Sequence, residues 1–167
     1  MVGPRGASAR SSHGGFPEWS FRPTGDWQTA EAGGSVGAVN ADAEGKAYPA
    51  STVTVDAQRV RDFAQAVGQT EAGIPPTFLT VAEFAVLGTI VDDPELDLDF
   101  GRVVHGEQEY VWHRPVGVGE TLVVAPRIAA IRRRGGLGFV TIEVLLSSQD
   151  GEPVATARST MIERPAT

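Results

Sequence analysis

The sequence predicts an α+β fold in which one antiparallel β-sheet wraps around a single central helix. Residues 77–91 are apolar on nearly every side of a helix, so this helix should be buried on most sides. Residues 106–164 then alternate apolar and polar side chains in runs separated by short turns, which is typical of antiparallel strands. Such a sheet must bury one face, and this chain offers one apolar helix to cover it.

The expected elements follow one another from residue 51. Alternating valines and threonines over 51–55 predict a short strand, and Asp56 is a suitable N-cap for a helix over 57–67. Pro75–Pro76 stand before the central helix, where a proline without N–H is tolerated in the first turn. Four strands are expected afterwards, over 106–116, 121–131, 137–149 and 152–164, with turns at 132–136 (RRRGG) and at Asp150–Gly151.

The composition is that of a globular protein and excludes several functions. The 167 residues are 41% hydrophobic and 21% charged, which suits one globular domain. A formal net charge of -7 disfavours nucleic acid as a partner, and the absence of cysteine excludes disulfides and thiol nucleophiles. No run approaches the ~18 apolar residues of a membrane helix, and the N-terminal residues lack an apolar signal segment. We therefore expect a cytoplasmic location without membrane contact.

Residues 1–38 differ in composition from the rest of the chain. They are rich in Gly, Ser and Pro and have no apolar periodicity, which predicts a disordered leader ahead of a globular domain over residues 39–167. Four aromatic side chains interrupt this leader, namely Phe16, Trp19, Phe21 and Trp27. They could dock on a partner or pack on the domain, but an unstructured leader is the simpler interpretation.

The residues from about Val39 to Arg164 resemble the MaoC-like, FAS1-type dehydratases. The resemblance is carried by RVVHGEQEYVWHRPVGVGETL, GGLGFVTIEV and QDGEPVATARSTMIER, with shorter matches at GKAYP, VRDFAQAVG and PPTF. It is to the N-terminal, non-catalytic half, which occurs fused in larger enzymes or as the accessory subunit of heterodimeric (3R)-hydroxyacyl-thioester dehydratases of fatty-acid elongation. The resemblance implies a single hotdog fold, an acyl-CoA or acyl carrier protein (ACP) substrate, no cofactor, and a catalytic MaoC-like partner subunit or a homodimer.

The resemblance also indicates what this chain lacks. Catalytic members carry an Asp and, five residues later, a His between the first helix and the central helix, and the pair activates water at a trans-2-enoyl thioester. Here residues 68–74, GQTEAGI, contain no histidine, and their only acid, Glu71, is most simply a solvated turn residue. We therefore expect no catalytic residue and no metal site, and a chain that is one component of a hydro-lyase (dehydratase or hydratase), inactive alone.

Two side chains outside that segment are weaker candidates for catalysis. Glu83 is an acid within the apolar helix, where hotdog thioesterases use a carboxylate to activate water; more simply, it extends a polar stripe with Thr77 and Thr80 toward solvent or a partner. His105 and His113 would share one face of an extended strand about 26 Å apart, too far for a common site. A structural or interface role is the simpler interpretation of His105.

The remaining candidates would bind the acyl group and its carrier. The residues expected at the acyl tunnel or the subunit interface are Pro76, Thr77, Phe78, Leu79, Ala82, Phe84, His105 and Gly106. The basic cluster Arg132, Arg133 and Arg134 is either a solvated hairpin tip or a contact site for coenzyme A phosphates or an acidic ACP. Three functions stay open: an accessory dehydratase subunit that shapes the acyl tunnel, a thioesterase that uses Glu83, and a non-enzymatic acyl-thioester binding or scaffold module.

Overall fold

The computed structural model describes residues 39–166, and the predicted leader over residues 1–38 lies outside them. The elements are, in chain order, η1 (Ala41–Ala43), β1 (Ser51–Thr54), α1 (Ala57–Ala66), α2 (Thr80–Val91), η2 (Phe100–Arg102), β2 (Val103–Trp112), β3 (Thr121–Arg134), β4 (Leu137–Ser148) and β5 (Pro153–Glu163), where η denotes a short 3-10 helix. The strands and α-helices occur in the predicted order.

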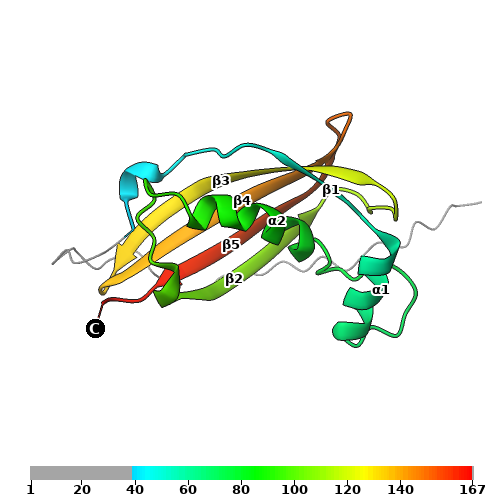
Figure 1. Ribbon diagram of the computed structural model, residues 1–167, viewed down its shortest axis with the longest axis horizontal. Helices are drawn as coiled ribbons and strands as arrows, with labels where there is room; N and C mark the ends of the chain where they lie inside the picture. Colours follow the sequence, from blue (N-terminus) through cyan, green and yellow to red (C-terminus); the bar gives the residue numbers. More distant parts are fainter. Residues whose placement is uncertain (1–38, 167) are drawn as a thin grey trace, which may run out of the picture.

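The strands form one antiparallel sheet, and α2 lies across one of its faces (Figure 1). The strand order is β1-β3-β4-β5-β2, so β1 and β2 are the two edges. Short hairpins join β3, β4 and β5, whereas β2 precedes β3 in sequence and pairs with β5 on the far side of the sheet. The predicted antiparallel sheet around one apolar helix is confirmed. Within the described residues, no strand pairs with the second edge of β2.

One side of α2 is buried and the other faces outward. Ala82, Val86 and Ile90 are at most 3% exposed, whereas Phe84 is 64% exposed. The expectation that this helix is buried on most sides is wrong for the chain by itself, because the sheet covers only one side of it. None of the helices in the described part of the chain is long and apolar enough to cross a membrane.

Local signals set where the two α-helices begin. The Asp56 side chain accepts a hydrogen bond from the backbone N–H of Arg59 at 2.9 Å, so it caps α1 as predicted. The helix α2 begins at Thr80, three residues later than the sequence indicated, because Pro75 starts a tight turn in which its carbonyl accepts from the N–H of Phe78 at 2.9 Å. Phe78 then packs edge-on against Phe63 of α1, with ring centroids 5.6 Å apart.

The β3–β4 hairpin closes in two residues. Gly135 and Gly136 have φ angles of 57° and 79°, which glycine adopts readily and which a tight hairpin turn of this hand requires. Because the turn is so short, β3 continues to Arg134, which pairs with Leu137. The assignment of all of residues 132–136 to a turn is therefore wrong, and the three arginines belong to the strand.

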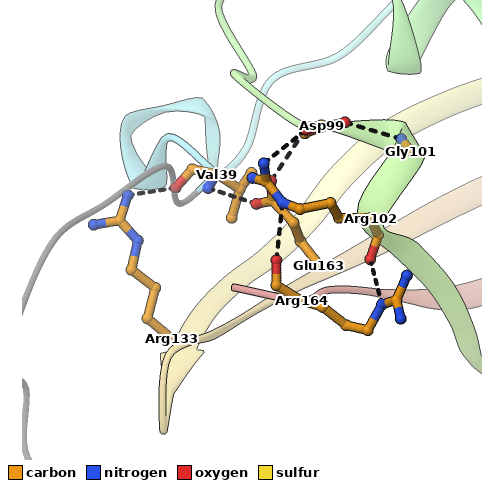
Figure 2. A network of polar contacts seen from close by, with 7 residues as sticks. All are labelled: Val39, Asp99, Gly101, Arg102, Arg133, Glu163 and Arg164. Carbon is orange, nitrogen blue, oxygen red and sulfur yellow. Dashed lines mark hydrogen bonds and ion pairs between the residues drawn. The ribbon is translucent and has the colours of Figure 1, made fainter. Parts of the chain in front are cut away.

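A buried carboxylate ties three segments together at one end of the sheet (Figure 2). Glu163, the last residue of β5, is 1% exposed and accepts hydrogen bonds from the backbone N–H groups of Val39 and Asp99, each at 3.1 Å. It also pairs with Arg102 at 2.6 Å, and Arg102 contacts the Asp99 carboxylate at 2.7 Å. The network thus anchors both Val39 and η2, which leads directly into β2.

Candidate functional site

An apolar pocket lies between α2 and the strands beneath it. Its volume is about 140 Å³, and apolar side chains of α2, η2, β2, β4 and β5 form most of its wall. The polar side chains in the wall are Thr80, Glu83, His105, Gln108 and Ser159. The pocket therefore brings together Glu83 and His105, the two side chains that the sequence indicated separately as candidates for catalysis.

Glu83 points from α2 toward the sheet and not toward solvent. It is 8% exposed, and its two carboxylate oxygens accept hydrogen bonds from the Tyr110 hydroxyl and from the side-chain amide of Gln108, the latter at 3.0 Å. The Tyr110 hydroxyl also contacts the Thr80 hydroxyl at 2.6 Å. The simpler interpretation of Glu83, as part of a stripe facing solvent or a partner, is wrong, because two polar side chains of β2 hold it inside the fold.

The surroundings of Glu83 change its protonation. Burial raises the pKa of the Glu83 carboxyl above its ordinary value, while the hydrogen bonds from Tyr110 and Gln108 and the charge of His105 oppose that rise. Burial and the neighbouring carboxylate likewise raise the pKa of Tyr110. A carboxyl of this kind in an apolar cavity can accept a proton from water or bind a polar group of a ligand.

A β-bulge at Gly106 decides which way the histidines face. His105 pairs with Met161 and Glu107 with Thr160, so Gly106 is an extra residue on β2. A Cβ added to Gly106 would lie 2.5 Å from the Ile162 Cδ1 atom, and glycine avoids this clash because it has no Cβ. The bulge shifts the alternation by one residue: His105 lines the pocket, and His113 bonds to Thr156 at 3.1 Å on the opposite face. The prediction that both histidines share a face is therefore wrong.

The predicted acyl-tunnel residues of α2 and its preceding turn occupy two different environments. Phe84 and His105 line the pocket, and Phe84 is 64% exposed. Phe78, Leu79 and Ala82 are between 1% and 3% exposed in the core and do not line this pocket. Packing against α1 and the sheet explains their apolar character without a ligand.

The segment between α1 and α2 is a short surface loop. Glu71, Pro76 and Thr77 are all exposed on it. The side-chain amide of Gln69 closes the loop by donating to the carbonyl oxygens of Glu71 and Gly73, at 3.2 and 3.4 Å. The loop holds an isolated carboxylate on its surface and no imidazole.

The three arginines at the end of β3 do not form one patch. All three are exposed, but strand alternation places Arg132 and Arg134 on one face of the sheet and Arg133 on the other. Arg133 donates a hydrogen bond to the carbonyl oxygen of Val39, beside the Glu163 network (Figure 2). One face of the sheet therefore presents two of these arginines, Arg132 and Arg134.

Sequence reasoning missed the hydrogen-bond partners of both buried carboxylates. The sequence did contain a signal for Tyr110 and Gln108. Residues two apart on a strand share a face, and both of these have a polar group that could reach a buried carboxylate on α2. Glu163 likewise follows Ser159 and Met161 at a spacing of two, on the buried face of β5. No sequence pattern near Glu163 indicated that Arg102 and the Val39 backbone would contact its carboxylate.

The architecture is that of known hotdog dehydratases. The chain superposes on a chain of the HadBC (3R-hydroxyacyl-ACP dehydratase) complex of Mycobacterium tuberculosis with a TM-score of 0.61 and 26% identity, over 72% of this chain and 97% of that one. It superposes on a MaoC-like dehydratase with a TM-score of 0.63 and 20% identity, over 74% of this chain and 43% of that one. The class is therefore a dehydratase-like hotdog protein, and the predicted fold is confirmed.

Sequence comparison then defines the family. The model of the FAS1-like, dehydratase domain region matches residues 71–157. A UPF0336 protein of Saccharopolyspora erythraea is 34% identical over 72% of this chain and 88% of its own length. A UPF0336 protein of Streptomyces coelicolor is 32% identical over 73% of this chain and 93% of its own length. The chain belongs to the FAS1-like dehydratase domain family, which agrees with the FAS1-type dehydratases that the sequence resembles.

Proposed function

We propose that this chain is the accessory, non-catalytic hotdog subunit of a (3R)-hydroxyacyl-thioester dehydratase, an enzyme that also hydrates enoyl thioesters. The observation that carries the proposal is the loop between α1 and α2, which has no histidine and whose one acid, Glu71, is exposed. Hydration needs a base that takes a proton from water and an acid that completes the addition, and each typically contributes about 10²–10⁴-fold. A partner subunit would supply the Asp and the His.

The surface of the chain favours a second hotdog subunit as that partner. Within the described residues β2 is an edge strand, and an unpaired edge is a template for pairing with another sheet. Phe100 precedes this strand and Trp112 ends it, and they are 51% and 36% exposed; Phe84 on α2 is 64% exposed. The structural relative from Mycobacterium tuberculosis is itself a complex. A catalytic MaoC-like subunit is the partner we propose, with a homodimer as the alternative.

In the assembled enzyme this chain would contribute one half of the joined sheet and an apolar pocket for the acyl chain. The substrate would be an acyl-CoA or acyl-ACP thioester of fatty-acid metabolism in the cytoplasm. Arg132 and Arg134 are exposed at the end of β3 and could contact the phosphates of the carrier. No cofactor is required, because the addition of water to an enoyl thioester needs only proton transfers.

A second candidate function, thioester hydrolysis, is favoured by one observation. Glu83 is buried in the wall of the pocket, its pKa is raised by burial, and His105 lines the same cavity. The carboxylate would take a proton from water, the hydroxide oxygen would attack the thioester carbonyl, and the thiol would leave with a proton. Both carboxylate oxygens are already hydrogen-bonded, by Tyr110 and Gln108, which makes this the weaker candidate.

The experiment compares the purified chain with a reconstituted complex. The chain alone, and the chain mixed with a MaoC-like subunit that has an intact Asp and His, are assayed for loss of the enoyl absorbance of a trans-2-enoyl thioester and for release of free thiol. We expect no hydration by the chain alone and hydration by the complex at a rate above that of the catalytic subunit alone.

Each other outcome assigns a different function. Strong hydratase activity of the homogeneous chain would contradict the accessory role. Thiol release that Glu83→Ala abolishes would make the protein a thioesterase. Acyl-thioester binding with neither activity, in the presence of every catalytic subunit that binds the chain, would leave the non-enzymatic binding module.

A further inference from the structure

We infer that Glu83 limits the length of the acyl chain that this pocket accepts, to a segment of about six carbon atoms. The inference rests on the proposed function, in which the pocket binds the acyl group of the substrate. It names a specificity-determining residue and a substrate class, acyl thioesters no longer than about octanoyl, whose last six carbon atoms would fill the pocket. Three observations carry it: the volume of the pocket, the separation of its polar and apolar ends, and the contacts that hold Glu83 in place.

The volume of the pocket sets the size of the group that fits. An apolar cavity of about 150 Å³ accommodates benzene, a group of six carbon atoms. The pocket under α2 has a volume of about 140 Å³ and is largely apolar. It therefore has room for a short alkyl segment and not for the long chain of a fatty acid.

The two ends of the pocket differ in polarity. Glu83 and Gln108 line one end, and Ile90, Phe100 and Val103 line the other. Glu83 and Ile90 are seven residues apart on α2, which corresponds to about 10 Å along the helix axis. An acyl segment that enters beside the exposed Phe100 would pass Ile90, Val103 and His105 before it meets the carboxylate.

Contacts behind Glu83 make this polar end difficult to displace. Its carboxylate is held by Tyr110 and Gln108, and Tyr110 is held in turn by Thr80. An alkyl carbon offers no hydrogen bond in exchange, so a longer chain would leave a buried carboxylate and its donors unsatisfied. An acyl chain that already reaches Glu83 therefore gains no binding affinity from additional methylene groups.

The test measures binding of straight-chain acyl-CoA thioesters, from butanoyl to dodecanoyl, to the full chain by calorimetry. For the natural chain we expect the affinity to rise about fourfold per buried methylene and then to stop rising near octanoyl, once the pocket is full. Glu83→Ala removes the carboxylate and its methylene, so the rise should continue for at least two more methylenes. Glu83→Gln keeps the size and the polarity of the end and should leave the break unchanged.

The controls separate this role from charge, folding and catalysis. Glu71→Ala makes the same change on the exposed loop and should leave the length profile as it is in the natural chain. If Glu83→Ala fails to fold, Glu83→Ser shortens the side chain with a polar group in its place, while Tyr110 keeps the Thr80 hydroxyl as a partner, and it should move the break in the same direction. Glu83→Gln also distinguishes a length limit from a general base, since it would abolish hydrolysis by Glu83.

The inference and the proposed function can fail separately. A break that Glu83→Ala and Glu83→Ser leave in place, an affinity that rises steadily to dodecanoyl in the natural chain, or no binding of any acyl-CoA would overturn the role of Glu83. Because binding is measured without a partner, a break that moves with Glu83 stands even if no catalytic subunit gives hydratase activity. Hydration by the complex with an unchanged length profile in the Glu83 variants would support the function alone.

Discussion

Glu163→Ala should destabilise the fold more than any exposed carboxylate substitution. Glu163 is 1% exposed and accepts hydrogen bonds from Arg102 and from the N–H groups of Val39 and Asp99 (Figure 2). Val39 is itself fully buried, so its N–H would lose its acceptor without gaining water. A buried unsatisfied donor costs about 1–3 kcal/mol, and breaking a buried ion pair costs about 3–5 kcal/mol.

Arg102 reduces that cost, because its side chain is 26% exposed and keeps Asp99 as a partner. We therefore expect a loss of about 3 kcal/mol in the free energy of unfolding. For a domain of this size the melting temperature should fall by roughly 10 °C. Thermal unfolding followed by circular dichroism measures the shift.

The matched control is Glu152→Ala. The Glu152 side chain is 66% exposed and pairs with Arg114 at 3.1 Å. An exposed pair contributes about 0–1 kcal/mol, so the melting temperature should change by no more than a few degrees. Glu163→Gln, which keeps the shape but presents an N–H group to donors, should fall between the two. If Glu163→Ala melts within about 2 °C of Glu152→Ala, the network does not anchor Val39 and η2.

Three further predictions concern other parts of the chain. Deletion of residues 1–38 should leave the melting temperature nearly unchanged; a drop of more than a few degrees, or about 1 kcal/mol, would mean that Trp19 or Trp27 packs on the domain. Replacing Arg132 and Arg134 together by alanine, with Arg133 left to hold the Val39 carbonyl, should weaken acyl-CoA or acyl-ACP binding at low salt. The difference should shrink at high salt, because exposed charges are screened beyond about 8 Å at physiological ionic strength; equal affinities at low salt would exclude a carrier contact. The folded-state pKa of Glu83 lies above its ordinary value of 4.5, so between these two values the folded chain still holds a proton that the unfolded chain has lost. The natural chain should therefore lose stability relative to Glu83→Gln as pH rises from about 4.5 to the raised pKa. Urea unfolding of both proteins across that range measures this difference, and parallel stability curves would contradict the raised pKa.

The elements of this fold could be predicted because each has a local signal. Asp56 supplies a side-chain cap, and the helix that follows begins where the cap requires. The glycines at 135 and 136 allow a two-residue turn. The run of apolar residues that contains α2 is long enough to exclude a strand, and the runs after it alternate. These signals act over a few residues and do not depend on the rest of the chain.

The orientation of the site residues could not be predicted in the same way. The direction of Glu83 depends on which side of α2 the sheet covers, and the polar residues that precede it in sequence, Thr77 and Thr80, were compatible with either side. The direction of His113 depends on the bulge at Gly106, and a bulge is a property of two strands and not of one. Both errors arise where a contact between distant segments overrides the local pattern.

Strand β2 joins the two features on which the proposed function depends. On the side that faces α2, Gln108 and Tyr110 hold the Glu83 carboxylate at the polar end of the pocket. The backbone edge of the same strand is the one that the described residues leave unpaired. A partner that pairs with this edge would fix the position of β2, and with it the two donors that keep Glu83 in the pocket wall. Occupancy of the pocket and association with the partner should therefore be coupled, and by thermodynamic reciprocity a short acyl-CoA should tighten the complex by the same factor by which the partner tightens acyl-CoA binding.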